Sequence, residues 1–566
     1  MKTYLSTILI FSLLSQSALA SDKTVARRLQ RHAIQKLEIQ ASFGAVPERK
    51  LALFGWGKKK EESEEIDPEE AQAATPDTLT EGEISPEIME IIPQGPLTAT
   101  QSWQKPNYSS QTGALGYSEN TFSTPDGLKS RVAFWRDIYS KYTTNQGVMH
   151  DSLHIQIVYH PVDFNSIMRD NSLNSRQRHH ARERLVNGYR RDIEDRLKRL
   201  AKVNSAAGLQ GEDLRVWKMY ESVTDPDKFG AATKRGRVRF QLGQKDRFAL
   251  GIYYAGRYIR EMEKIFKNEG LPIELTRLPF VESSFNIYAR SRVGASGIWQ
   301  FMRRTARPYM MVNNAVDERN DPIKATRSSA KLLKSNFMML KSWPLALTGY
   351  NHGPNGIARI VKKTGTTDLA EIINKYSSRR FGFASENFYA CFLAALEVER
   401  SANKYFGGVK WSVPLDHAEI KLTKPVPFEA VKVWFRDDAE LAQLFNPHFS
   451  PNVRRGRTDM PRGTNVRVPP AMREVAEEFL TGKMNLGEMR NQAKKSYAKI
   501  PILPEGTPVA TISAMPSPAP SPEVSKPTAT PIIIPVDSKD EDEEPLEEMP
   551  EDLGVKATPK SGDEFR

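Results

Sequence analysis

The sequence is poor in cysteine, with a single residue of this type, Cys391, in a chain of 566 residues. One thiol cannot form an intrachain disulfide bond, so the fold must be held together by the burial of apolar side chains. Cys391 shares one helical face with Phe388, Phe392 and Ala395. Because a buried thiol behaves as a small apolar group, we expect Cys391 to pack in a core rather than to act as a nucleophile.

Long apolar runs are also scarce. The clearest one, residues 8–14, follows a basic residue and precedes small residues at Ala18 and Ala20. This order is typical of a secretory signal peptide, here residues 1–20. A bilayer-spanning helix needs about 18 apolar residues, and no later stretch reaches that length. Ser21, rather than a cysteine that could carry lipid, follows the expected cleavage site, so we predict an exported, periplasmic protein without a lipid anchor.

One pair of histidines has a spacing that resembles a metal site. His150 and His154 have the four-residue spacing of a zinc-binding helix, but the metalloprotease motif requires glutamate directly after the first histidine. Asp151 stands there instead, and the residues that follow favour a strand. We therefore expect no metal and no other cofactor.

Basic residues exceed acidic ones by 81 to 69, a net charge of +12. Acidic runs lie at residues 61–70 and 537–552, so the middle of the chain is more basic than the average. Nucleic acid is an unattractive partner for an exported protein. An anionic wall polymer, with peripheral contact to the envelope surface, suits this charge better. Nothing in the sequence indicates the oligomeric state.

Composition and periodicity predict a mainly α protein with disordered ends. The ends are rich in charge, Pro, Ser and Thr and cannot bury enough apolar surface to offset chain entropy. The predicted segments are a signal peptide (1–20), a disordered linker (21–125), an α/β accessory region (126–245), a helical domain (246–405), a small α/β appendage (406–500) and a disordered Pro-rich and acidic tail (501–566).

Apolar periodicity places the main helices. The predicted helices cover residues 178–200, residues 246–268 with a stop at Gly270, a stretch from Pro272 to Glu282, a segment opened by the N-cap Asp321 and Pro322, a short segment around Tyr350, and residues 385–401.

The most informative stretch is residues 278–302, which carries Glu282 in an apolar frame. The frame consists of Leu278, Phe280, Val281 and Phe285. A carboxyl group in such surroundings resists ionisation, and an acid that is still protonated near neutral pH can donate a proton to a leaving oxygen. Taken alone, however, a glutamate at a helix end is more often a solvated or capping carboxylate.

The motifs that follow favour the chemical interpretation. Glu282 opens the run ESSFN, Ser291 follows nine residues later, and Gly297 opens GIWQ. A third run, GYNHG, starts at Gly349. This ordered series resembles the signature of the lytic transglycosylases and goose-type lysozymes. With tryptophan at its third position, the GIWQ motif resembles that of the membrane-bound lytic murein transglycosylase D branch.

This resemblance implies a goose-lysozyme-like helical fold for residues 246–405, with Glu282 as the single catalytic acid and base. It implies cleavage of peptidoglycan strands at the β-1,4 bond between N-acetylmuramic acid and N-acetylglucosamine, with closure of a 1,6-anhydro ring. The substrate-binding residues that it implies are Ser283, Ser291, Gln300, Met302, Tyr350, Asn351 and Tyr389.

Two alternatives stay open: a goose-type lysozyme-like hydrolase and an inactive peptidoglycan-binding protein. A hydrolase of the usual kind needs a second carboxylate, and residues 283–302 contain none. Glu274 lies about two helical turns upstream of Glu282, too far along the axis unless the helix bends. The remaining candidates are Asp317, Glu318, Asp321 and Glu386.

Two aromatic positions depend on context. Trp299 could stack on a sugar, but a core position is favoured, since a Trp has so much area to bury. Tyr389 follows Glu386 by three residues, whereas the related enzymes often have a Glu four residues before a cleft Tyr. Glu386 could therefore equally be a first-turn residue after an N-cap at Ser385, stabilised by the helix dipole.

Overall fold

The computed structural model describes residues 113–407, 411–412 and 414–498. Helices dominate this part of the chain, and its five strands form two small sheets, so the predicted mainly helical class is confirmed. None of the helices described is both long enough and apolar enough to cross a bilayer. The predicted signal peptide and tail, and most of the predicted linker, lie outside the described residues.

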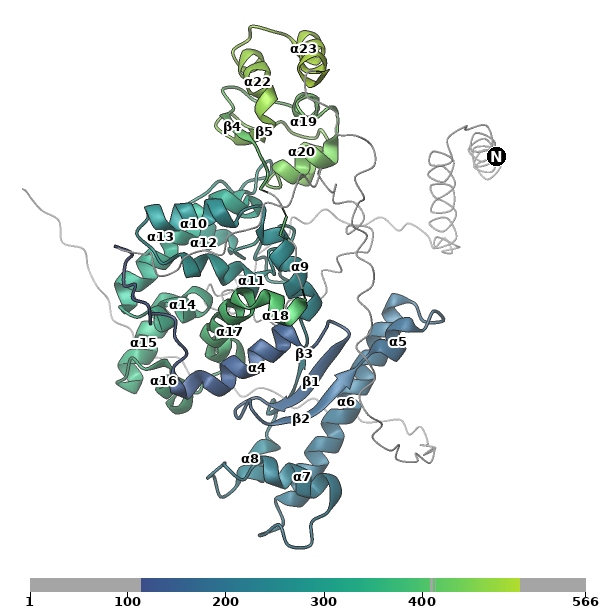
Figure 1. Ribbon diagram of the computed structural model, residues 1–566, viewed down its shortest axis with the longest axis vertical. Helices are drawn as coiled ribbons and strands as arrows, with labels where there is room; N and C mark the ends of the chain where they lie inside the picture. Colours follow the sequence, from purple (N-terminus) through teal and green to yellow (C-terminus); the bar gives the residue numbers. More distant parts are fainter. Residues whose placement is uncertain (1–112, 408–410, 413, 499–566) are drawn as a thin grey trace, which may run out of the picture. The chain divides into compact units, whose positions relative to one another are not determined.

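The central part is a group of helices around α17, which contacts α4 (Lys129–Ser140), α11 and α14 (Figure 1). In chain order the central elements are α9 (Lys245–Ala255), α10 (Ile259–Asn268), η4 (Ile273–Arg277), α11 (Leu278–Glu282), α12 (Arg303–Ala306), η5 (Glu318–Asn320), α13 (Pro322–Leu340), α14 (Trp343–His352), α15 (Pro354–Thr364), α16 (Leu369–Lys375), α17 (Phe383–Arg400) and α18 (Ala402–Phe406). Most of α17 is buried, Cys391 included. The predicted core position of this thiol is confirmed.

The single helix predicted over residues 246–268 is wrong, because the chain breaks between α9 and α10 at Gly256. A side chain at Gly256 would collide with the backbone of Ser412, whose N–H donates to the carbonyl oxygen of Tyr253 at 3.0 Å. The crossing of this distant segment fixes the end of α9, and nothing near Gly256 in the sequence shows it.

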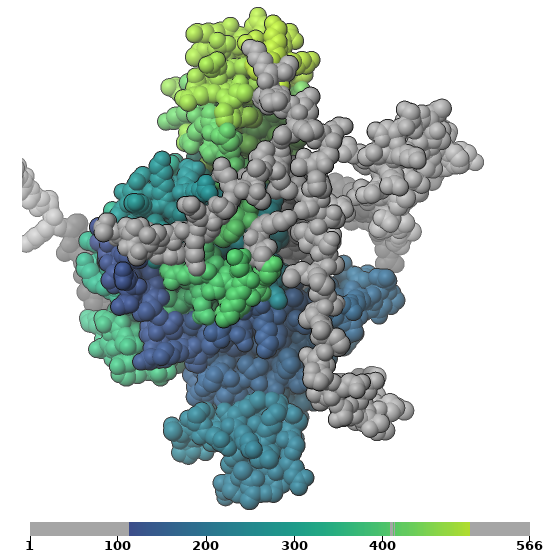
Figure 2. Space-filling view, viewed as in Figure 1, coloured from purple at the N-terminus to yellow at the C-terminus, as the bar shows by residue number. Residues whose placement is uncertain are grey.

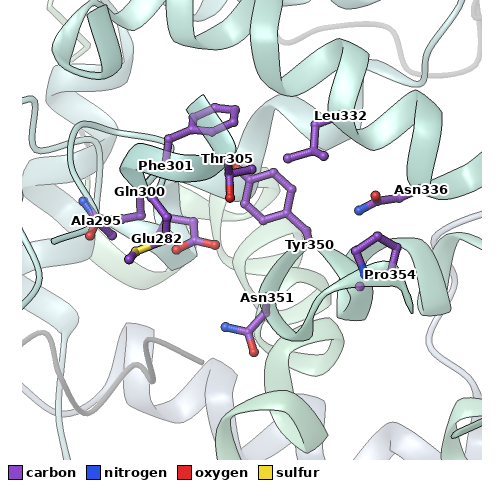
Figure 3. A pocket seen from close by; sticks show the side chains of 12 residues that line it. Glu282, Ala295, Gln300, Phe301, Thr305, Leu332, Asn336, Tyr350, Asn351 and Pro354 are labelled. Carbon is purple, nitrogen blue, oxygen red and sulfur yellow. The ribbon is translucent and has the colours of Figure 1, made fainter. Parts of the chain in front are cut away.

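The helix that carries the GYNHG run is positioned by a well-capped neighbour. Asp321 accepts hydrogen bonds from the backbone N–H groups of Ile323 at 3.0 Å and Lys324 at 2.9 Å, so the predicted N-cap of α13 is confirmed. Helix α14 packs against α13 and continues through Gly353 into α15. This geometry directs Tyr350 toward the end of α11 (Figure 3).

The accessory region contains an antiparallel three-stranded sheet in the order β2-β1-β3. Its elements are β1 (Gln146–Asp151), β2 (Val158–Asp163), α5 (Asn165–Arg169), α6 (Ser175–Leu200), α7 (Gly211–Met219), α8 (Lys228–Ala232) and β3 (Val238–Leu242). Helix α6 includes the helix predicted over residues 178–200, and it buries Ile193, Leu197 and Leu200. His150 and Asp151 lie on β1, so the spacing of His150 and His154 is not helical.

Ordered structure reaches into the end of the predicted linker. Phe122 is buried against Trp343 and Phe392, ahead of η3 (Asp126–Leu128). The apolar face of α4 joins the same central core. In Figure 2 the dark blue of these first described residues lies directly against the green of residues near 400.

The appendage is a small α/β unit with its own apolar core, as the sequence predicts. Its elements are β4 (Ala418–Lys421), α19 (Phe428–Val433), α20 (Ala439–Phe445), α21 (Pro451–Arg454), β5 (Asn465–Val468), η6 (Pro470–Met472), α22 (Arg473–Leu480) and α23 (Leu486–Ala498). It is tied to the N-terminus of α13 by the Arg467 guanidinium, which lies 2.6 Å from the Asp321 carboxylate.

The packing of α4 predicts a large effect of Trp135→Ala on stability. Trp135 is fully buried and donates a hydrogen bond to Asn387 of α17 at 3.2 Å. We expect the substitution to lower the free energy of unfolding by about 3–5 kcal/mol, measured by chemical denaturation followed by circular dichroism. Leu153→Ala, at a side chain that is 43% exposed, is the control. A loss below about 1 kcal/mol for Trp135→Ala would contradict a core role for α4.

Candidate active site

One pocket brings together the end of α11, residues 289–302, here called the signature loop, and the helices from α12 to α15 (Figure 3). Its lining residues are Glu282, Ala295, Gln300, Phe301, Met302, Thr305, Leu332, Asn336, Gly349, Tyr350, Asn351 and Pro354. Five of the residues singled out from the sequence are among them, from three separate motifs. In Figure 3 the Glu282 carboxylate points into the pocket between Gln300 and Tyr350.

Glu282 is the last residue of α11, and its surroundings hold it neutral. All four residues of the predicted apolar frame are buried, none more than 4% exposed. Burial removes water from the carboxylate and raises the pKa of Glu282 to about 8 from its usual 4.5. The group is therefore largely protonated at neutral pH, and it becomes a base once it has given its proton away.

Left-handed backbone conformations surround this carboxyl group. Ser284 and Phe285 have φ values of 49° and 57°, and Gln300 has 47°. Such conformations are unfavourable for residues other than glycine and persist only where the surrounding structure imposes them. Here they turn the chain sharply after α11 and again at the end of GIWQ, so that both segments reach the same pocket.

Gln300 presents an acceptor to the pocket. Its amide nitrogen donates to the carbonyl oxygens of Gly297 at 2.8 Å and Ala289 at 3.1 Å. These bonds use both N–H groups and fix the orientation of the amide, because a carbonyl oxygen can only accept. The side-chain oxygen Oε1 is therefore the atom of Gln300 suited to a hydroxyl or acetamide N–H of a ligand.

Hydrogen bonds to Trp299 and to Ser385 hold Tyr350 and Asn351 in place. The Tyr350 hydroxyl donates to the carbonyl oxygen of Trp299 at 2.8 Å, and burial together with the charge of Glu282 raises the pKa of Tyr350. Asn351 Oδ1 accepts a hydrogen bond from Ser385 Oγ at 3.1 Å, and His352 Nδ1 lies 3.2 Å from the same hydroxyl. Ser385 of α17 therefore orients the amide of Asn351.

Three other residues named from the sequence do not line the pocket. The Ser283 hydroxyl donates to the carbonyl oxygen of Ile298 at 2.9 Å and so fastens the signature loop to α11. Ser291 Oγ accepts the N–H of Ala295 at 2.9 Å within the loop. Tyr389 is 1% exposed. The burial of Tyr389 supports a role in packing.

Trp299 belongs to the core, as favoured from the sequence. It is fully buried, stacks on Phe266 with ring centroids 5.8 Å apart, and donates to Thr326 Oγ1 at 2.9 Å. The indole ring of Trp299 therefore attaches the signature loop to the core.

Arg319 was not identified from the sequence, yet it braces the signature loop. Its guanidinium pairs with Asp317 and donates to the carbonyl oxygens of Gly294 at 2.6 Å and Phe301 at 3.0 Å. Ser296 adds a bond to Asn320 at 2.6 Å. The signal that could have pointed here is the dense run of charge at residues 317–321, which is almost entirely buried.

The other candidate carboxylates are engaged elsewhere. Glu274 is buried 3.4 Å from Arg400, and burial raises the pKa of Glu274. Glu318 accepts the N–H of Met311, and Glu386 lies in the first turn of α17. The N-cap there is Gly382, so the predicted cap at Ser385 is wrong; the Ser385 hydroxyl serves Asn351 instead. Among the described residues that line the pocket, Glu282 carries the one carboxylate.

The segment that holds this pocket is similar to known proteins. Residues 258–373 match the family model of the Transglycosylase SLT domain. The chain is 33% identical over 98 residues to membrane-bound lytic murein transglycosylase D of Escherichia coli (strain K12), a match that covers 17% of this chain and 22% of the relative.

Two further matches are more distant. A putative tributyltin chloride resistance protein of Alteromonas sp. (strain M-1) is 30% identical over 112 residues, or 19% of this chain and 51% of that protein. An X-ray structure of an inactive mutant of lytic transglycosylase Slt from Pseudomonas aeruginosa is 16% identical, with a TM-score of 0.23, and the match covers 43% of this chain and 37% of that one.

The brace on the signature loop predicts unequal effects at its two glycines. Gly297 has φ 79°, and a Cβ there would collide with the carbonyl oxygen of Arg319, whereas Gly294 has φ 92° and open space around it. We expect Gly294→Ala to lower the free energy of unfolding by about 1–2 kcal/mol from backbone strain. Gly297→Ala should cost about 1–3 kcal/mol more from the collision. Equal losses in denaturation would contradict this close approach.

The raised pKa of Glu282 predicts that Glu282→Gln becomes stabilising as pH rises. The folded protein holds the Glu282 proton up to about pH 8, and the unfolded chain releases it near 4.5. The wild type therefore loses stability, relative to the neutral Gln variant, as pH rises from about 4.5 to 8. The measurement is the difference in Tm between the two proteins across this range. Glu371→Gln, at an exposed carboxylate whose pKa is lowered by a hydrogen bond from Lys375, should show a flat difference.

Proposed function

We propose that this chain, which carries a transglycosylase SLT domain at residues 258–373, is a lytic transglycosylase that cleaves peptidoglycan glycan strands. The observation that carries the proposal is a lone pocket carboxyl group, Glu282, whose pKa of about 8 suits both giving and taking a proton near neutral pH. The family match and the three converging motifs support the same reaction class.

In the proposed first half-reaction, Glu282 donates its proton to the oxygen of the β-1,4 bond between N-acetylmuramic acid and N-acetylglucosamine. The bond from this oxygen to C1 of the muramic residue breaks, and the N-acetylglucosamine side leaves with a hydroxyl group. The acetamide oxygen of the muramic residue stabilises C1, which removes the need for a second carboxylate. Glu282 is left ionised, and burial makes this form a willing base.

In the second half-reaction, the C6 hydroxyl of the same muramic residue attacks C1 and gives its proton to Glu282. A 1,6-anhydro ring closes, the acetamide is released, and the acid is restored without water. Gln300 Oε1 is placed to accept from a sugar hydroxyl or acetamide N–H, because both of its N–H groups are already bonded. Asn351, oriented by Ser385, would bind on the opposite side.

The signal peptide predicted from the sequence is consistent with this substrate. We propose that the protein is exported to the periplasm, where peptidoglycan strands are its partner.

Two other functions can be separated from this one. A lysozyme-like hydrolase would need a group that activates water, and the described residues lining the pocket contribute no carboxylate besides Glu282. Burying Glu282 costs free energy, because it disfavours the charged form of the carboxyl group. A protein that only bound peptidoglycan would gain nothing from this cost.

The test is digestion of purified peptidoglycan, followed by mass analysis of the products. The wild type should release muropeptides that are one water lighter than the corresponding reducing ends. Glu282→Gln should lower the rate by about 10²–10⁴-fold, because the variant can neither donate nor accept the proton. Glu371→Gln, at an exposed carboxylate on α16, should digest at the wild-type rate. Products with reducing ends would establish the hydrolase instead.

A further inference from the structure

The loop between Ala289 and Gly297 lies beside the pocket and is closed by backbone hydrogen bonds. Ser291 N–H donates to the carbonyl oxygen of Ala295 at 3.0 Å, and Gly297 N–H donates to that of Ala289 at 3.0 Å. The Arg319 brace fixes its outer turn. The side chains of Arg290, Arg292 and Val293 on this loop are exposed, as is that of Tyr288 just before it, with an exposed fraction of 45%.

This loop borders the pocket that holds Glu282, because Ala295 is one of the lining residues. Arg290 forms a backbone bridge with Ser296, and Ser296 forms another with Phe301, which lines the pocket. Two neighbouring bridges at strand-like spacing put the backbone of Arg290 about 10 Å from that of Phe301. A group attached to a sugar bound against Phe301 would have to cover about this distance to reach Arg290.

A second arginine reaches this loop from the appendage. The N–H of Asp317 donates to the carbonyl oxygen of His448 at 2.9 Å, and Ser450 N–H donates to that of Ala315 at 3.0 Å. Ser450 then caps α21, the short helix that ends at Arg454. Partial burial lowers the pKa of Arg454, Tyr288 acts in the opposite direction, and the positive charges of Arg455 and Arg290 lower it further.

The charges at this place are unbalanced. Within the described part of the chain, Arg290, Arg454 and Arg455 form no ion pair with a carboxylate, and the positive charges of Arg290 and Arg455 both act on Arg454. Crowding like charges costs free energy that an anionic ligand would recover. Arginine suits carboxylates, because its planar guanidinium can bind both oxygens at once.

We propose that Tyr288, Arg290 and Arg454 form a subsite for the carboxylates of the peptide stems carried by the muramic residues of the substrate. The inference rests on the proposed function, since the stem is delivered by the sugar bound in the pocket. Attachment to that sugar raises the local concentration of the stem at the arginines far above that of a free anion. The subsite would make the enzyme prefer stem-bearing strands to bare glycan.

The experiment measures binding of fluorescent glycan strands to the full chain carrying Glu282→Gln, which blocks turnover. Strands with intact stems are compared with strands from which an amidase has removed the stems. Adding Arg290→Gln and Arg454→Gln should lower the preference for stem-bearing strands about tenfold. The control is Arg184→Gln with Arg191→Gln, which removes the same charge from exposed positions on α6 and should keep the preference.

Three results would overturn the subsite. They are an unaltered preference in the double variant, an equal fall in the control, and displacement of stem-bearing strands by polyphosphate as effectively as by free stem peptide. The last would identify a general anion surface. Failure of the proposed function looks different: the wild type would then release no anhydro product from either strand, whatever the binding comparison gives.

Discussion

The partial removal of water from the Glu282 carboxyl group, which still opens to the pocket, is the constraint on which the rest of the site depends. The pKa of about 8 has burial as its cause, so it lasts only while the surrounding groups keep their places. The apolar wall comes from α11 itself and from the turn that follows it. The other wall is the signature loop, which has no regular secondary structure to hold it beyond isolated bridges. A loop that opened would let water in, and Glu282 would become an ordinary ionised carboxylate.

Arg319 holds the signature loop in place through hydrogen bonds. Burying an arginine and an aspartate is costly, and such a pair is weak support for stability by itself. Here Arg319 also donates hydrogen bonds to the carbonyl oxygens of Gly294 and Phe301, and so links two ends of the signature loop. The segment around Arg319 is in turn fixed by the appendage, through the bonds of Asp317 to His448 and of Asp321 to Arg467. The appendage therefore contributes to the geometry of the pocket without lining it.

Local patterns carried much of the prediction. The N-cap at Asp321, the core position of Cys391 and the apolar frame of Glu282 follow from neighbours in sequence, and all three are present. The break at Gly256, the role of Arg319 and the bond of Ser385 to Asn351 each join residues far apart in the chain or depend on the exact turn of a loop. Propensity and periodicity do not report such contacts. For the same reason, motif matching did not show that the hydroxyls of Ser283 and Ser291, predicted to bind substrate, form hydrogen bonds that hold the loop together.

The two properties of Glu282, its isolation and its raised pKa, argue for the same chemistry. A hydrolase that uses water needs an ionised base beside a protonated acid, and therefore a polar, wet position for the second group. A pocket whose described lining residues include a single carboxyl group, kept neutral by desolvation, works against such a water. It favours a nucleophile that arrives already attached to the substrate and needs no second carboxylate to orient it. Under the proposed function, the C6 hydroxyl of the muramic residue would meet that condition, and the proton it releases would return to Glu282.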